Sequence, residues 1–154
     1  MSEQVKKRNP WRKGMLISVL VLAVVFAIIY WIVATDTFSD TKDRKAAYTV
    51  NAFDFLKEFK QDEKAASKKY GGKIIAVNGR VSAVEPADTT LNIKFTDSAS
   101  GDYIIFAFQS QHVAEARTLK AGDSVSIKAA YSDYMHSEIL DVYSITFQRS
   151  TLNK

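Results

Sequence analysis

The stretch from Met15 to Ala34 constrains this chain more than any other, because its twenty residues include no charged side chain and no proline. Thirteen of them are Leu, Ile, Val or Phe, and Ser18 is the only plainly polar residue. A helix rises about 1.5 Å per residue, so a helix of this length covers roughly 30 Å, the thickness of a bilayer's hydrocarbon core. The sequence therefore predicts a single transmembrane helix over residues 15–34.

Aromatic residues flank this run, with Trp11 before it and Tyr30 and Trp31 at its far end. Amphipathic rings prefer the membrane–water interfaces, so we expect these three side chains there. A cleavable signal peptide is the alternative, but its apolar region is about 7–15 residues long and ends in small residues. The run here is longer, and residues 33–36 form a poor cleavage site. The pattern favours a retained anchor.

The charges on the two sides of the run predict its orientation. Acidic and basic residues nearly cancel over residues 35–45, whereas Glu3 is the only acid in residues 1–14. Positive charge stays on the cytoplasmic side, so residues 1–14 are expected in the cytoplasm and residues 35–154 outside a cytoplasmic membrane crossed once. The basic residues before the run are Lys6, Lys7, Arg8, Arg12 and Lys13.

The formal net charge of +4 and the pI of about 9.2 would suit a nucleic-acid partner, but the distribution of charged residues along the chain argues against one. Residues 1–14 alone carry +4, equal to the charge of the whole chain. Residues 74–148 hold five basic and nine acidic residues, a net charge of −4. The basic excess therefore reflects topology and one lysine-rich helix, and nucleic acid is disfavoured as a partner.

About 120 residues follow the anchor, enough for one domain with a core. In the first part, Phe55, Leu56 and Phe59 have the spacing of a helix that buries one face. Asn51 is a candidate N-cap and Asp62 could begin a second segment, so one bent helix or two are expected. The patterns divide the chain into a basic tail (1–14), the anchor (15–34), a linker (35–45), a helical segment (46–72), a β-rich region (73–148) and a polar tail (149–154).

From Lys73 onward the apolar residues recur with a period of two, which predicts strands. Gly79 within the first strand suggests a bulge or a tight bend. Five strands with a short helix between the third and fourth have the order of an OB-fold. The expected fold class is thus an N-terminal transmembrane helix followed by an α+β domain, a helix plus a five-stranded OB-fold β-barrel. The expected strands cover residues 75–83, 91–96, 103–109, 125–129 and 137–148, with a helix over 112–120 and a loop over 132–134.

Several segments resemble a known family. They are Ala47 to Phe59, Ala65-Ala66 with Tyr70 to Lys73, Val77 to Val81, and Leu119 to Lys128 with its Gly-Asp turn. On these segments, residues 46–147 resemble the bacterial tRNA-anti-like family of OB-fold domains. The resemblance implies a helix-plus-OB domain, often behind a signal or an anchor, and brings no catalytic motif. The family often has cysteines on the third and last strands, where this chain has Phe106 and Tyr143.

The face of the second and third strands is the usual binding surface of an OB-fold. With the apolar residues of these strands turned inward, the outward candidates are Arg80, Asn92, Lys94 and Tyr103. One aromatic ring with two cations could stack a base or a sugar ring. An ordinary mixed exterior is the alternative interpretation.

Motifs for catalysis, cofactors or metals do not emerge from the sequence. The chain has no cysteine and no phosphate-binding glycine motif, and its two histidines, His112 and His136, are 24 residues apart. A loop metal site at His136 with Asp133 and Glu138 is an alternative to two surface histidines. We therefore expect no enzyme, cofactor or metal.

The sequence favours a membrane-anchored, extracytoplasmic OB-fold binding module that engages an envelope protein or saccharide. The alternative is a single-stranded nucleic-acid-binding OB protein. A hydrolase or metal-dependent enzyme is a third hypothesis, which the sequence favours less.

Overall fold

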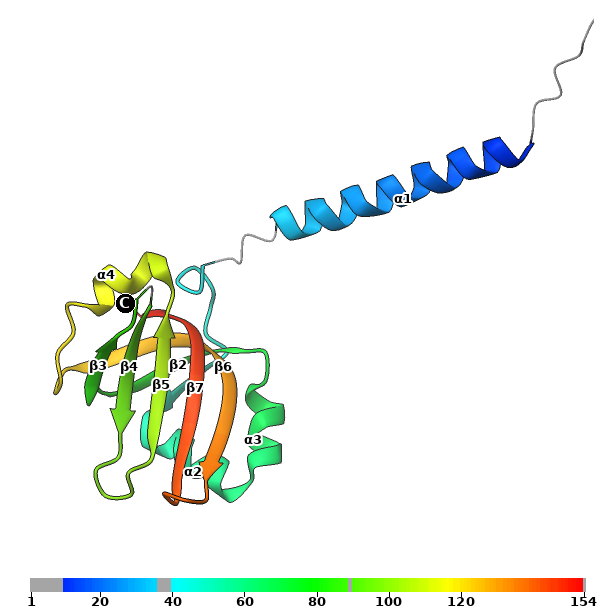
Figure 1. Cartoon of the computed structure of the whole chain (residues 1–154). Coiled ribbons are helices and arrows are strands. Elements are labelled where there is room, and N and C mark those ends of the chain that lie inside the picture. Colours follow the sequence, from blue (N-terminus) through cyan, green and yellow to red (C-terminus); the bar gives the residue numbers. More distant parts are fainter. Residues whose placement is uncertain (1–9, 36–39, 89, 154) are drawn as a thin grey trace, which may run out of the picture. The chain divides into compact units, whose positions relative to one another are not determined.

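The computed structural model describes residues 10–35, 40–88 and 90–153 (Figure 1). The chain divides into two compact units, Met1–Ser39 and Asp40–Lys154. The basic residues Lys6, Lys7 and Arg8 lie outside the described residues, and so do the side chains of Arg12 and Lys13.

The described residues of the first unit form the helix α1 (Pro10–Thr35). It begins before the predicted run because proline suits the first turn of a helix, where its missing N–H has no partner to lose. The segment Gly14–Trp31 has a mean hydropathy of 2.6 and none of it is buried. The helix is therefore long and apolar enough to cross a membrane, a property that signal sequences share. The rings of Trp11, Tyr30 and Trp31 are all exposed.

The second unit is a seven-stranded sheet with the order β1-β2-β6-β7-β5-β4-β3. The β1–β2 and β5–β7 pairs are parallel and the other pairs are antiparallel. Figure 1 shows the sheet curling, with α2 and α3 at one end and α4 at the other. The elements are β1 (Tyr48–Asn51), α2 (Ala52–Gln61), α3 (Glu63–Tyr70), β2 (Ile74–Arg80), β3 (Ala83–Pro86), β4 (Leu91–Thr96), β5 (Tyr103–Phe108), η1 (Ser110–His112), α4 (Val113–Ala116), β6 (Ser124–Ser137) and β7 (Val142–Leu152).

The prediction of a five-stranded OB-fold β-barrel is wrong in strand number, because the sheet has seven strands, and this sheet is not a closed barrel. The predicted first strand is broken into β2, which pairs with β6, and β3, which pairs with β4. At the break, the N–H of Val81 donates to the carbonyl of Asp123 and the N–H of Ser82 donates to that of Lys94. Each half thus bonds to a different neighbour. The sheet order ends at β1 and β3, so the sheet is OB-like but not a closed barrel.

The extra strand β1 occupies residues that the sequence assigned to a helix. Tyr48, Thr49 and Val50 are aromatic or β-branched, which favours a strand, and they pair with β2. The helix begins only after Asn51, whose side chain accepts a hydrogen bond of 3.0 Å from the N–H of Phe53. The predicted N-cap is confirmed, and the helical segment starts six residues later than expected.

The helical region consists of two helices, one of the two expected alternatives. Asp62 separates them, with φ −154° and ψ 90°, and its side chain accepts a hydrogen bond of 3.0 Å from the N–H of Ala65. An Asp at this position satisfies an N–H that the first turn of α3 would otherwise leave unpaired.

The C-terminal predictions need three corrections. β6 runs through residues 132–134, where a loop was expected, and β7 continues to Leu152 through the expected polar tail. Ser150 and Thr151 are fully buried. Bulges in the β6–β7 pairing interrupt the alternation of apolar residues, so the pattern in the sequence ends before the strands do. The helix expected over 112–120 is only η1 followed by α4.

A continuous set of buried aromatic rings joins the helices to the sheet. Phe55 of α2 lies 5.5 Å from Phe147 of β7, centroid to centroid. Phe147 stacks on Phe106 of β5 at 5.1 Å, and Phe106 lies 4.8 Å from Phe95 of β4. Aromatic pairs at such separations add about 0.5–1.5 kcal/mol beyond area burial. The core thus runs from α2 across the inner face of the sheet.

Substitution of Gly79 tests how tightly β2 packs on this core. A Cβ at Gly79 would lie 2.6 Å from Cδ2 of Phe95 and 3.1 Å from Cβ of Ala52, and both neighbours are buried. Gly79→Ala should therefore lower the free energy of unfolding by about 1–3 kcal/mol in urea titrations followed by tyrosine near-UV circular dichroism. The double variant Gly79→Ala/Phe95→Leu should lose less than the sum of the single variants. Additive losses would contradict this packing.

Candidate functional site

The outer surface of β3, β4 and β5 corresponds to the binding surface predicted from the sequence. Alternate residues of β4 and β5 are buried, including Ile93 and Phe106, and the residues between them are half-buried. We call the outward set the β3–β5 face. It consists of Ala83 and Glu85 on β3, Asn92, Lys94 and Thr96 on β4, and Tyr103, Ile105 and Ala107 on β5.

Lys94 is at the centre of the β3–β5 face. Its Nζ lies 2.9 Å from Oε1 of Glu85 and 4.9 Å from the ring centroid of Tyr103. The lysine is thus neutralised by a carboxylate while its ammonium lies against the aromatic ring. Glu85 was missed by the sequence analysis because the register of β3 on β4 decides that it lies beside Lys94.

The four predicted ligand residues are only partly brought together. Asn92 is two residues from Lys94 on the same face, opposite Ala107 of β5. Arg80 instead ends β2 and pairs with Ser124 of β6. The break after β2 explains this separation, because Arg80 belongs to the half-strand that pairs with β6. As ligand contacts, Arg80, Asn92, Lys94 and Tyr103 stay predictions.

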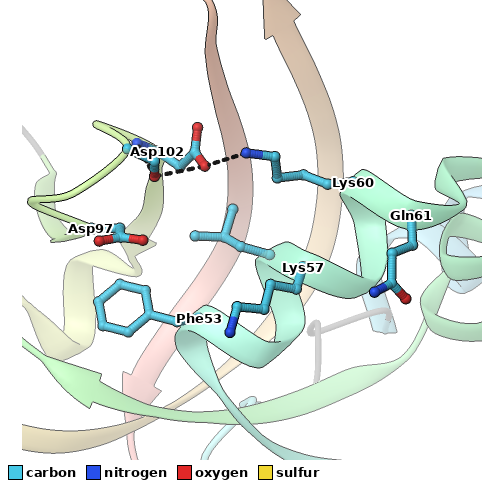
Figure 2. Close-up of a pocket in the computed structure, with 8 residues that line it drawn as sticks. Phe53, Lys57, Lys60, Gln61, Asp97 and Asp102 are labelled. Atoms are coloured by element: carbon cyan, nitrogen blue, oxygen red, sulfur yellow. Dashed lines mark hydrogen bonds and ion pairs between the residues drawn. The ribbon is translucent and has the colours of Figure 1, made fainter.

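A cavity of about 260 Å³ lies between α2 and the turn that joins β4 to β5. We call it the α2–turn cavity. Figure 2 shows Lys60 reaching across it towards Asp102, with Phe53 and Lys57 on the helix side and Asp97 on the turn side. No sequence motif marks this site, because its two walls are distant in the chain. The lining residues are Phe53, Leu56, Lys57, Lys60, Gln61, Asp97, Ser100 and Asp102.

The buried carboxylate of Asp102 holds one wall of the α2–turn cavity in place. Its Oδ2 accepts hydrogen bonds from Lys60 Nζ at 2.9 Å and Ser100 Oγ at 2.8 Å. Its Oδ1 accepts the N–H of Tyr143 at 2.9 Å. Burial would raise the pKa of Asp102, but these three donors outweigh burial and hold the pKa below its ordinary value. The hydrogen bond to Asp102 raises the pKa of Lys60.

The two histidines make hydrogen bonds with separate aspartates. Buried His112 places Nε2 2.7 and 2.8 Å from the two carboxylate oxygens of Asp40. His136 lies 3.0 Å from Asp141 and stacks on Tyr143 at 4.1 Å between ring centroids. The partner of His136 is therefore Asp141 and not the Asp133 or Glu138 considered in the sequence analysis. Within residues 10–35, 40–88 and 90–153, no group of three or more metal-ligating side chains could hold an ion.

Comparison with known families agrees with this OB-like topology. A family model described as tRNA_anti-like matches residues 9–141. The chain belongs to the tRNA_anti-like family. Members of such a family share a fold, whereas function depends on the particular site. No curated protein sequence matches this tRNA_anti-like chain.

The chain is also similar to solved structures. One is a lipoprotein from Klebsiella pneumoniae subsp. pneumoniae that is described as a candidate nucleic acid-binding protein. It is 19% identical, with a TM-score of 0.54, over 68% of this chain and 91% of that one. Another is the asparaginyl-tRNA synthetase of Entamoeba histolytica, which is 15% identical, with a TM-score of 0.37, over 53% of this chain and 20% of the synthetase.

Replacement of Asp102 tests its structural role. Asp102→Asn should lower the free energy of unfolding near neutral pH by about 2–3 kcal/mol, because a charged acceptor of three hydrogen bonds is lost. Because the pKa of Asp102 is lower in the folded chain than its ordinary value of 3.8, the ionised carboxylate stabilises the fold at pH values above 3.8. This stabilisation is lost as the pH falls through the pKa of Asp102 in the folded chain. The variant should therefore show a smaller loss of stability on acidification, measured by urea titration at several pH values. Exposed Asp88→Asn is the control, and equal effects of the two variants would contradict the assignment.

Proposed function

We propose that this chain is a membrane-anchored, non-catalytic binding module whose OB-like unit lies outside the cytoplasm. In this proposal, the unit engages an envelope protein or saccharide through the β3–β5 face. The observation that carries the proposal is the pairing of Lys94 with Glu85, which leaves that face close to neutral. A neutral polar surface with one half-buried ring, Tyr103, suits a protein or sugar better than a polyanion.

The placement of the unit rests on α1 and on the charges of the chain. The helix has the length and hydropathy of a membrane span. The excess of basic residues before it supports an N-terminus in the cytoplasm. Retention of the helix, in place of cleavage as a signal, belongs to the same proposal.

The orientation predicts which part of the chain is open to protease. Protease added to intact spheroplasts should degrade residues beyond α1 and leave a short fragment with the N-terminal tail. A tag after Lys154 should disappear while a tag before Met1 persists, as read by immunoblot. Full protection of the C-terminal tag in intact cells, with digestion after lysis, would contradict the orientation.

Site-specific photo-crosslinking tests the β3–β5 face. A photoreactive amino acid at Asn92 should yield an envelope-derived adduct of discrete mass, because Asn92 lies beside Lys94 on that face. The same amino acid at exposed Lys68 of α3 is the control and should not give that adduct. Tyr103→Ala should reduce the Asn92 adduct, since the ring supports Lys94. Identical adducts from Asn92 and Lys68 would argue against the face.

Single-stranded nucleic acid is the second candidate ligand. Two observations favour it: the description of the Klebsiella pneumoniae fold relative and the position of Lys94 over the Tyr103 ring. Nucleic-acid binding of this type combines base stacking with strongly salt-dependent phosphate contacts. Oligonucleotide titrations at two salt concentrations distinguish the candidates. Salt-sensitive binding that is lost in Lys94→Gln and Tyr103→Ala would favour nucleic acid over the envelope ligand.

A further inference from the structure

The α2–turn cavity has a second set of binding groups, separate from the β3–β5 face. No lining residue of the cavity belongs to that face. The helix contributes its side chains from one stripe, because Phe53, Lys57 and Lys60 follow the i, i+4, i+7 spacing of a single helix face. Phe53 and Leu56 make the apolar part of the wall and the lysines make its charged part.

Some hydrogen-bonding groups of the cavity already have partners within the protein, and others do not. Asp102 is fully engaged, and the hydroxyl of Ser100 both donates to its carboxylate and accepts its N–H. Lys60 uses one of its three donors on Asp102, which leaves two, and its ammonium also lies 4.5 Å from the ring centroid of Tyr143. Lys57 is exposed, and its ammonium has no hydrogen bond or ion pair within the described part of the chain.

The turn side of the cavity provides an acceptor. One carboxylate oxygen of Asp97 accepts the N–H of Ala99 at 3.0 Å, and its other oxygen has no protein partner among the described residues. Gln61 adds an exposed amide at the rim. The groups left for a ligand are therefore two ammonium groups, one carboxylate oxygen and one amide, next to a phenyl ring.

We propose that the α2–turn cavity binds a small hydroxylated carboxylate with the size and shape of one acidic sugar ring. The carboxylate pairs with Lys57 and with the remaining donors of Lys60, a charge-assisted interaction. A hydroxyl donates to the unpaired oxygen of Asp97, and the apolar face of the ring packs on Phe53. The volume of about 260 Å³ suits a ligand smaller than the drug-sized molecules that fill typical pockets of about 300–1,000 Å³.

This inference goes beyond the proposed function and does not depend on it. Failure of the Asn92 crosslink would leave the cavity and its ligand groups as they are. Failure of ligand binding in the cavity would equally leave the β3–β5 face unaffected.

Isothermal titration of the full chain in detergent micelles tests the site with D-glucuronate as the probe. D-glucose lacks the carboxylate and phenylacetate lacks the hydroxyls, so both should bind at least about fivefold more weakly, by a loss of about 1 kcal/mol or more. Equal binding of glucose would overturn the role of the lysines. Equal binding of phenylacetate would overturn the role of the hydroxyls, and no binding of glucuronate at about 10 mM would overturn the proposal.

Two variants assign the binding to this cavity. Lys57→Gln removes an unpaired ammonium and Asp97→Asn keeps an oxygen for the N–H of Ala99, so both should fold with unchanged urea midpoints. Each should weaken glucuronate binding at least about fivefold, as expected for the loss of one charged hydrogen bond. Lys64→Gln changes an exposed lysine of α3 that does not line the cavity, and its affinity should equal that of the parent chain. Equal affinity of Lys57→Gln and the parent would overturn the site.

Discussion

The buried carboxylate of Asp102 connects three parts of the folded unit. It accepts hydrogen bonds from Lys60 of α2, from Ser100 in the β4–β5 turn and from the backbone of Tyr143 in β7. A buried charge is costly unless its hydrogen-bonding capacity is satisfied, and here three donors satisfy it. The position of α2 relative to the turn, and with it the shape of the α2–turn cavity, depends on this group.

Aromatic packing adds to this electrostatic connection. Phe55 and Phe59 of α2 and Tyr70 of α3 are buried together, and Phe55 continues the contact to Phe147 in the sheet. The same packing that covers one end of the sheet leaves the outward stripe of α2, with Lys57, facing the cavity. Helix amphipathicity therefore creates both the core and the candidate ligand site.

The chain enters the folded unit at the other end of the sheet (Figure 1). Asp40 pairs with His112 of η1, and Lys42 pairs with Glu115 of α4 at 3.2 Å. A hydrogen bond from the N–H of Lys42 lowers the pKa of Asp40, and His112 adds to this effect against the opposing influence of burial. The first residues of the unit are thus held at the end that carries α4, away from α2 and its cavity.

Local patterns in the sequence determined several features of the fold. The apolar run, the caps at Asn51 and Asp62 and the alternation of β4 are all consequences of short-range periodicity and capping chemistry. The family resemblance over most of the chain was correct for the same reason. Lys94 and Tyr103 could be placed on one face because strand alternation fixes which side chains point outward.

Only the tertiary structure decided the rest, because it depends on pairings between distant residues. The break after Arg80, the continuation of β7 through Ser150 and the pairing of Glu85 with Lys94 follow from strand register and bulges. The α2–turn cavity likewise needs Lys57 and Asp97, forty residues apart, on facing walls. The sequence by itself determined a helix long and apolar enough to cross a membrane and an OB-like fold, whereas long-range packing decided which charges are neutralised and which stay available to a ligand.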